Sequence, residues 1–524
     1  MAVRPGTRLE TGDAGDRKNP GTENELGCFF DRNADGSVHQ KAFAGQSFDR
    51  TVHKGDLTGI EIINRLAEQV WARNINRLEE HRAVELIRTK DGGAIAGVLM
   101  IDMRTGEFCF VQAKAVLLAT GGGPTMYKYH TPSGDKSCDG MAMALRAGLP
   151  LRDMEMVQFH PTGVLAGAGT RITGTIIEEG LRGSGGYLLG GDQQRFMHKY
   201  DARCERATRD IVSRAMYTEM RNGNTTPNGG IYISMGHLGP ENVAKQFKGM
   251  VERCADCGFD LAGGLVEVVP TAHYMMGGVQ FRADCSTELS GLFAAGEDTG
   301  GVHGANRLGG NGVANSTVFG GIAGDAMARY VKGGASSAPA ASGAASGEVP
   351  SSHASAGQAR ATLRAPDEAA ITRAIAAAEV PFTRPVASLE PIRETLYECM
   401  WDGAGILRTA AGLQRAKTQL AQLDAQLDAT GVTDGDRTFN LTWHDWLNLK
   451  NLVQVSRVIV EAALAREDSR GAHFREDFPE TGDLPTSTYT VVRQQDARIV
   501  LTREPVRFTR VKPGESLLPA THSV

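Results

Sequence analysis

Histidine, arginine and glutamate side chains suited to binding and protonating a small anion recur between residues 160 and 307. His273 and Arg307 stand among glycines, which let the backbone approach a ligand closely. An arginine also presents a planar fork that pairs with a carboxylate through two hydrogen bonds. These residue types predict a site for a dianion, with His273 and Arg307 among its binding groups.

A second set of residues is suited to proton transfer. Glu179 and Arg182 are three positions apart, a spacing that places both side chains on one side of a helical turn. In isolation such a pair is more often a surface ion pair, worth about 0.3–0.5 kcal/mol. Arg209 lies further along the chain, and an arginine stays protonated at every working pH. It could therefore act as an acid only if another group restores its proton quickly.

A short apolar run precedes a cluster of glycines at Thr120–Gly123. The run covers residues 115–119 and is typical of a buried parallel strand that meets a ligand at its carboxyl end. Residues 139–148 follow as a predicted helix, with Asp139 expected as its N-cap and Gly148 as its end. This order predicts an α/β region that binds a cofactor.

Composition narrows the class of protein. A chain of 524 residues suggests two to four domains. Its net charge of −5 and pI of about 6.3 give no sign of a nucleic-acid surface. No apolar run approaches the roughly 20 residues of a membrane span. Eight cysteines do not form a disulfide framework in so long a chain, and the single Cys254-x-x-Cys257 pair does not indicate a metal site, so a reducing, cytoplasmic compartment and no metal are expected.

The remaining elements follow from periodicity. Apolar residues at helical spacing predict helices over residues 60–71, 412–431 and 445–466, the last two in an antiparallel bundle. Residues 489–508 alternate enough to predict a hairpin. Residues 332–368 are rich in Ala, Ser, Gly and Pro and predict a flexible linker.

In its His160-Pro-Thr-Gly, Pro-Thr-Ala-His273-Tyr-Met-Met-Gly-Gly and Gly-Ala-Asn-Arg307-Leu-Gly-Gly-Asn segments, the chain resembles the flavoprotein subunit of succinate dehydrogenase and fumarate reductase. L-aspartate oxidase is a weaker match. The resemblance implies FAD as cofactor and hydride exchange with succinate or fumarate. It also implies a membrane quinone module and an iron–sulfur partner subunit. A cytoplasmic protein with such partners would be located at the inner face of the cell membrane.

The resemblance also assigns roles to single residues. It implies Arg209 as the acid, recharged through Glu179 and Arg182. It assigns substrate binding to His160, His273 and Arg307, with Glu178 beside them. The residues that it assigns to FAD binding are Gly121, Gly122, Asp139, Glu297, Gly312 and Val313.

The implied fold is a Rossmann-like α/β flavin-binding domain that lacks its first βαβ unit, joined to an α+β capping domain, a C-terminal helical bundle and a small C-terminal region. The expected division is 1–24 disordered, 25–158 partial FAD-binding domain, 159–272 capping domain, 273–331 returning FAD-binding segment, 332–368 linker, 369–473 helical bundle and 474–524 C-terminal region.

Three departures from the family pattern qualify these expectations. Glu178 stands where the family has a threonine that touches substrate, although a shifted register with Thr175 as the hydroxyl is a second option. Gly312 and Val313 occupy the positions at which the family has serine and leucine. No strand, Gly-x-Gly-x-x-Gly turn and helix precede Glu25, so weak FAD binding is expected. Alternatives to a succinate–fumarate enzyme are therefore an L-aspartate oxidase-like enzyme and an inactive remnant that cannot hold FAD.

Overall fold

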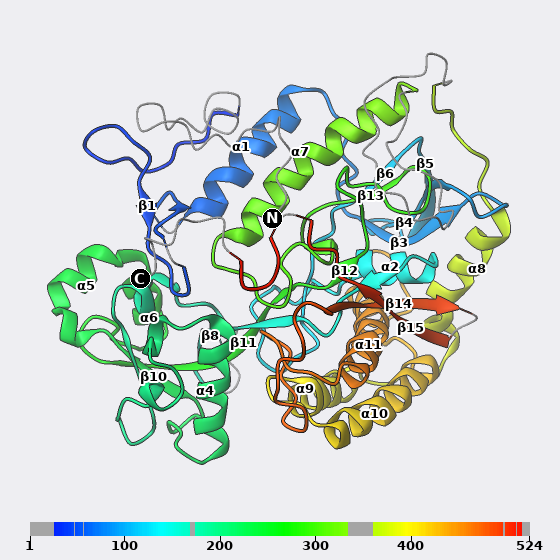
Figure 1. The fold of residues 1–524 in the computed structure, drawn as a ribbon. Helices are drawn as coiled ribbons and strands as arrows, with labels where there is room; N and C mark the ends of the chain where they lie inside the picture. The colour runs from blue at the N-terminus through cyan, green and yellow to red at the C-terminus, as the bar shows by residue number, and fades with distance from the viewer. Residues whose placement is uncertain are drawn as a thin grey trace.

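The structure is a computed structural model that describes residues 26–46, 48–55, 57–167, 173–333, 360–495, 498–509 and 511–515. The expected disordered segment 1–24 and most of the expected linker, 334–359, lie outside the described residues. Figure 1 shows a sheet with its helices at the lower left, a helical group at the lower right, further strands at the right, and long helices across the top.

The parallel strands β6 (Val116–Leu118) and β13 (Leu292–Ala294) form the centre of the α/β region. An antiparallel sheet of β3 (His81–Arg88), β4 (Ile95–Asp102) and β5 (Glu107–Gln112) lies next to them. Both parallel strands are apolar and end in glycine-rich loops, as the sequence predicts for strands whose carboxyl ends face a ligand.

Helices α2 (Asp139–Arg146), α7 (Asn311–Val331) and α1 (Thr58–Ala72) accompany these strands. The expected Asp139 cap is wrong: Cys138 is the N-cap residue in a left-handed conformation, and Asp139 lies in the first turn, where its carboxylate bonds Arg82. Helix α1 lies beside α7 (Figure 1) and confirms the helix predicted over residues 60–71. It has no buried residue, and Ile60 and Ile63, read at helical spacing from the sequence, are exposed.

A second sheet has the strand order β8-β11-β10-β9. Its strands are β8 (Val157–Val164), β9 (Tyr187–Leu189), β10 (Ile231–Ser234) and β11 (Leu265–Met275), and its helices are α3 (Gly180–Gly183), α4 (Arg209–Arg221), α5 (Pro240–Gln246) and α6 (Lys248–Asp256). Val212, Met216, Ile231 and Val268 belong to its own apolar core. This sheet and its helices therefore pack around an apolar cluster of their own.

The helical region contains α8 (Glu368–Ala378), α9 (Glu390–Ala404), α10 (Ala410–Ala429) and α11 (Leu441–Ala465). The predicted apolar stripe of α10 is buried, and Thr409 and Asn440 cap α10 and α11 through their side chains. Capping oxygens satisfy amide groups that have no partner within the helix. The two helices predicted from periodicity are thereby confirmed.

Strands β14 (Thr488–Gln495) and β15 (Arg498–Pro505) form the predicted hairpin. They continue a sheet that also contains β7 (Leu151–Arg152) and β12 (Gly278–Val279), while β1 (Gln40–Lys41) and β2 (Thr51–Val52) form a separate ribbon. Short 3-10 turns are Met197–Lys199, Cys204–Arg206, Gly236–Leu238, Gly296–Asp298 and Val380–Thr383. The C-terminal hairpin thus shares a sheet with β7, which comes shortly before residue 157 in the chain, and with β12, which comes shortly after residue 275.

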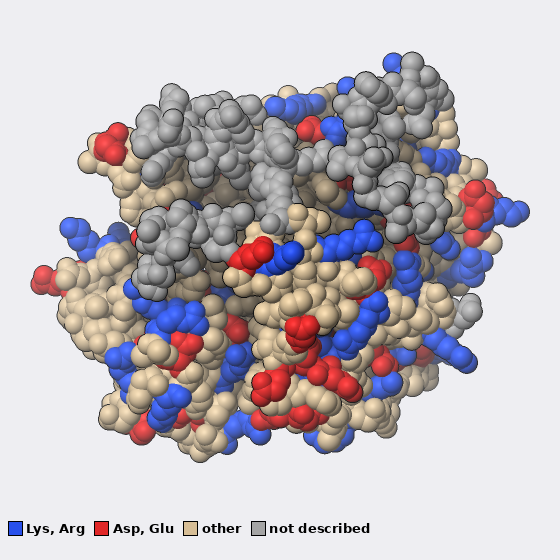
Figure 2. All heavy atoms as spheres, viewed as in Figure 1, with Lys and Arg blue, Asp and Glu red and all other residues tan. Residues whose placement is uncertain are grey.

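Charges of both signs are intermixed over the face shown in Figure 2. Inside the protein, Arg466 follows α11, and its Nε donates to Glu155 Oε1 at 2.5 Å while its Nη2 donates to Thr490 Oγ1 at 3.1 Å. Glu155 is completely buried and Arg466 is 2% exposed. This ion pair connects the helical region, the hairpin and the segment that enters β8.

We predict that Arg466→Met lowers the free energy of unfolding by about 3–5 kcal/mol, because it leaves a buried carboxylate without its cation. Urea unfolding measures the change. As a control, Arg457→Met removes the half-exposed ion pair with Asp424 (3.0 Å) and should cost less than about 1 kcal/mol. Equal costs for the two variants would contradict a structural role for the buried pair.

Candidate functional site

Two adjacent strands carry the site's histidines. His160 lies in β8, whose residues are all buried, and pairs in register with Thr271 of β11. The register shifts between Ala272 and Tyr274, which makes His273 the extra residue of a β-bulge. Bulges re-aim a side chain and often occur next to active sites. The rings of His160 and His273 consequently lie 5.4 Å apart between centroids.

Both histidines are neutral donors. The backbone N–H of Thr162 donates to His160 Nδ1 at 3.2 Å, so the proton of this imidazole is on Nε2. Burial and then the charge of Arg209 hold the pKa of His160 well below its usual value. Burial, and then the charge of Arg307, hold the pKa of His273 well below its usual value. His273 Nδ1 contacts Thr131 Oγ1 at 2.9 Å.

A chain of buried charges connects Arg209, Glu179 and Arg182. Arg209 donates from Nε (2.9 Å) and Nη2 (2.6 Å) to the two carboxylate oxygens of Glu179, and Arg182 donates to Glu179 Oε1 at 3.0 Å. Arg209 begins α4, and Glu179 directly precedes α3. Burial would raise the pKa of Glu179, but the guanidinium groups of Arg209 and Arg182 lower it to about 2. Glu179 is therefore a carboxylate held between two arginines.

Arg307 is the least satisfied charge of the group. It is 5% exposed and stacks on the ring of Tyr274, with 4.4 Å between its guanidinium carbon and the ring centroid. Among described residues, its guanidinium bonds only Leu308 O, at 3.4 Å, and its buried Nε has no partner. Burial and then Arg209 lower the pKa of Arg307 to about 9. A buried fork without an acceptor is suited to receive an anion.

The charges of this region sum to an excess of cations. Arg182, Arg209 and Arg307 all act electrostatically on His160, whereas Glu179 supplies one carboxylate between them. These three arginines and Glu179 together leave two positive charges, while Glu297 is a further acid near Arg307 whose pKa burial raises to about 7. Glu178, the additional acid noted in the sequence, is turned into an ion pair with Lys41, with 3.1 Å between Nζ and Oε1.

The glycine-rich loop that contains Gly121 and Gly122 could hold part of a cofactor. A Cβ added to Gly122 would lie 2.2 Å from Glu297 Oε1, so a larger residue would require the Glu297 side chain to shift. Gly121 has a φ of +80° and no atom near its missing Cβ, which leaves open space there. Burial raises the pKa of Glu297 to about 7. A carboxyl group in this position is suited to bond ligand hydroxyls, so the present residues fit the flavin and ribityl side of FAD.

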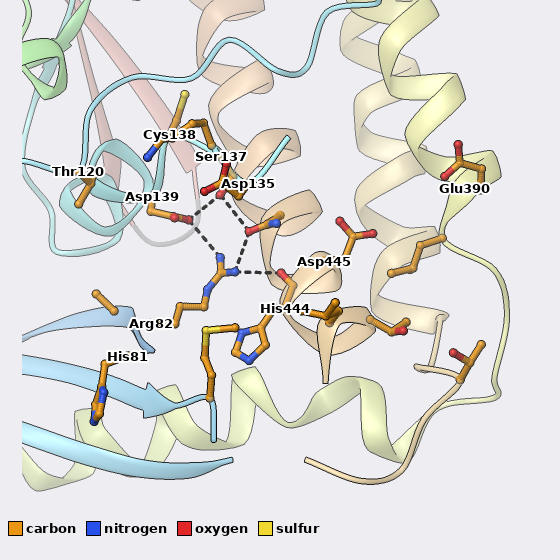
Figure 3. Close-up of a pocket in the computed structure, with 18 of the residues that line it drawn as sticks. His81, Arg82, Thr120, Asp135, Ser137, Cys138, Asp139, Glu390, His444 and Asp445 are labelled. Carbon is orange, nitrogen blue, oxygen red and sulfur yellow. Dashed lines mark hydrogen bonds and ion pairs between the residues drawn. The ribbon is translucent and has the colours of Figure 1, made fainter. Parts of the chain in front are cut away.

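Asp139 lines a cavity of about 1040 Å³ together with Thr120 and Gly122. Figure 3 shows Arg82 reaching toward Asp139, and the ion pair measures 3.1 Å. His444 also lines the cavity from α11, and neither nitrogen of its buried ring has a partner in the described part of the chain. Asp139 is therefore in a ligand-sized cavity, with one oxygen already bonded by Arg82.

Val313 lines a second cavity, of about 640 Å³, at the N-terminal end of α7. Lys41, Phe43 and Glu178 line the same cavity. Gly312 lies between this cavity and the arginine site, because a Cβ there would be 3.2 Å from Arg307 Nη1. Among the predicted cofactor residues, Gly122 and Asp139 thus line one cavity and Val313 lines another.

Three site residues were missed from the sequence. Gln158 accepts a hydrogen bond from Arg209 Nη1 at 3.0 Å and donates to Arg307 O at 2.7 Å. It is two positions before His160, and strand alternation could have placed it on the same face. Tyr274 supports Arg307 and follows His273 directly. Lys41 had no local signal, since it meets Glu178 only through the tertiary fold.

We predict that Glu179→Gln lowers the free energy of unfolding by about 3–5 kcal/mol at pH 7, because it leaves two buried arginines without their carboxylate. The folded pKa of Glu179 is about 2 against a usual value of 4.5, so its contribution is present above pH 4.5 and is lost as the pH falls toward 2. Chemical unfolding of both proteins from pH 7 to pH 3 should show a gap that narrows in acid. The exposed Glu252→Gln is a control with almost no effect. A gap that is constant across this range would contradict the assignment.

Parallel strands that end in glycine-rich loops, beside a buried cationic site, are typical of dinucleotide-dependent oxidoreductases. Comparison with known proteins gives the family. The profile described as "FAD binding domain" matches residues 19–313, and "Fumarate reductase flavoprotein C-term" matches residues 393–518. The chain belongs to the succinate dehydrogenase and fumarate reductase flavoprotein family, and it is a FAD-dependent oxidoreductase.

Relatives and solved structures agree with this family. The chain is 37% identical to a subunit of the fumarate reductase (CoM/CoB) from Methanothermobacter marburgensis, over 87% of this chain and 78% of that protein. It is 33% identical to the Escherichia coli fumarate reductase flavoprotein subunit, over 94% and 80%. A solved quinol fumarate reductase of E. coli superposes with a TM-score of 0.82 at 31% identity, covering 94% of this chain and 82% of that chain. These similarities support a flavin-binding α/β fold with a C-terminal helical region. No helix in the described ranges has the length and apolar character of a membrane span.

Proposed function

We propose that this chain interconverts succinate and fumarate, with Arg209 as the proton donor and acceptor. The observation that carries the proposal is the buried guanidinium of Arg307, whose Nε has no partner beside two neutral histidines. A dicarboxylate would supply the acceptors that Arg307 lacks and the two negative charges that balance the site.

Substrate binding follows from the donors present. Arg307 grips one carboxylate through its fork, which favours a planar, bidentate pair. His160 Nε2–H donates toward the same region, because its Nδ1 is already an acceptor for Thr162. His273 is the second histidine donor and lies 5.4 Å from His160 between ring centroids. Tyr274 holds the Arg307 plane in place by stacking against it.

Proton transfer follows the buried charges. Reduction of fumarate adds one hydride and one proton across its double bond, and bound FAD supplies or accepts the hydride. Arg209 gives the proton to the substrate carbon as charge develops there. A proton that Arg182 passes to Glu179 moves on to Arg209 along their hydrogen bonds, and Arg182 regains a proton from solvent to complete the cycle. Succinate oxidation runs these transfers in reverse. Gln158 fixes the remaining Nη1 of Arg209 and so sets the direction of its fork.

Gly121, Gly122, Glu297, Gly312 and Val313 are proposed to hold FAD, with Asp139 at the far end of the larger cavity. Under this proposal, residues 25–158 and 273–331 form the flavin-binding domain, 159–272 the capping domain, 369–473 the helical bundle and 474–524 the C-terminal region. The catalytic residues then lie where the capping strands β8 and β11 meet the glycine-rich loops.

Electron partners are proposed from the relatives. One relative is named 8-methylmenaquinol:fumarate reductase flavoprotein subunit, and one solved structure is a quinol–fumarate reductase with menaquinol. We infer two partners, a membrane quinone module and an iron–sulfur subunit, and thereby a peripheral place at the cytoplasmic face of the membrane. L-aspartate oxidase activity is less favoured, because these relatives are fumarate reductases.

We predict that Arg209→Lys lowers fumarate turnover of FAD-loaded protein by at least about 100-fold, which is about 2.7 kcal/mol in the barrier. Lysine keeps the charge but loses the fork that aligns with Glu179. Arg221→Lys, on the exposed end of the same helix, is the control and should turn over normally. Arg209→Lys turnover within about threefold of the parent would contradict the assignment, and turnover of L-aspartate rather than succinate or fumarate would overturn the proposed reaction.

A further inference from the structure

We propose that Lys41 is a positioning residue that keeps Glu178 out of the substrate's field and so preserves the preference for a dianion. The inference rests on the proposed function, because it concerns the same site. Lys41 lies in the β1–β2 ribbon, and Glu178 precedes Glu179 in the proposed capping domain. Their ion pair of 3.1 Å therefore joins two segments that are 137 positions apart.

The position of Lys41 is fixed by more than one contact. Its Nζ also donates to Gly55 O at 3.0 Å, at the end of the same ribbon. The side chains of Lys41 and Glu178 are 24% and 17% exposed, so the pair is partly shielded from water. A partly buried pair is screened less by salt than a surface pair. The ammonium group is thus available to cancel the charge of Glu178 at short range.

The pair lies next to the catalytic charges. Lys41, Glu178, Phe43 and Gly309 line one cavity. A Cβ added to Gly309 would lie 2.5 Å from Glu179 Oε2 and 2.5 Å from Phe43. The wall that contains Gly309 therefore faces the Lys41–Glu178 cavity on one side and the Arg209–Glu179 pair on the other.

The charge of the site explains why this pair is needed. Three arginines and Glu179 leave two positive charges for a dicarboxylate. Without Lys41, the carboxylate of Glu178 would lower the net positive charge of the site by one. It could then form an ion pair with a cationic group on a substrate. Lys41 restores the balance and already occupies Glu178, so the site stays selective for an unsubstituted dianion.

The test measures fumarate binding to the purified full chain by isothermal titration calorimetry at low ionic strength. Lys41→Met should weaken fumarate binding about tenfold, the scale of one uncompensated unit charge at an effective dielectric constant of about 20. Lys41→Arg should bind within about threefold of the parent, because it keeps the charge. Glu178→Thr should suppress the defect, so that the double variant Lys41→Met with Glu178→Thr binds within about threefold of the parent. The loss in Lys41→Met should shrink at high salt.

A matched control removes a lysine of the same region that does not contact Glu178. Lys54 pairs with Asp31 at 3.6 Å, and Lys54→Met should bind fumarate as the parent does. A Lys41→Met protein with parental affinity, or a double variant as weak as Lys41→Met alone, would overturn the inference.

Arg307→Met separates this inference from the proposed function. If Arg307→Met abolishes fumarate binding while Lys41→Met leaves it unchanged, only the role of Lys41 fails. If Arg307→Met binds fumarate normally, or the parent chain binds none, the proposed dicarboxylate site fails and the inference with it.

Discussion

The buried carboxylate of Glu179 is the interaction on which the site depends. It accepts both hydrogen bonds of the Arg209 fork and one from Arg182, with all three groups almost inaccessible to water. Two guanidinium groups could not remain together in this interior without an anion between them. Their charge keeps Glu179 ionised, and Glu179 in turn aligns Arg209 with the strand that contains Gln158 and His160.

The rest of the structure provides the dry and rigid surroundings that this arrangement needs. Strands β8 and β11 supply the histidines, the bulge at His273 turns that ring toward His160, and the stacked Tyr274 holds Arg307. The Arg466–Glu155 pair anchors the segment before β8 to the helical region. Among the described residues, Arg307 has no side-chain acceptor for its guanidinium, and the proposed substrate would supply one.

Elements with strong periodicity were predictable from the sequence. The stripe of α10 and the hairpin β14–β15 were read correctly from their apolar periodicity, and β6 was read correctly from a continuous apolar run. Local glycine and histidine motifs also supplied candidate site residues, and their roles remain predictions. The bulge at His273, the support from Gln158 and the pairing of Lys41 with Glu178 could not, since each depends on register or on contacts between distant segments. The Asp139 cap was wrong because Arg82 and Asn451, distant in sequence, bind that carboxylate instead.

The central claim is that Arg307 and the two histidines receive one dicarboxylate beside Arg209. A crystal structure of the chain with fumarate tests it most directly. The account predicts one carboxylate in a bidentate contact with Arg307, histidine nitrogens within hydrogen-bond distance of the ligand, and the Arg209 guanidinium beside the double bond, with the Glu179 contacts retained. Fumarate bound elsewhere, or bound here with Arg307 turned away from both carboxylates, would contradict it.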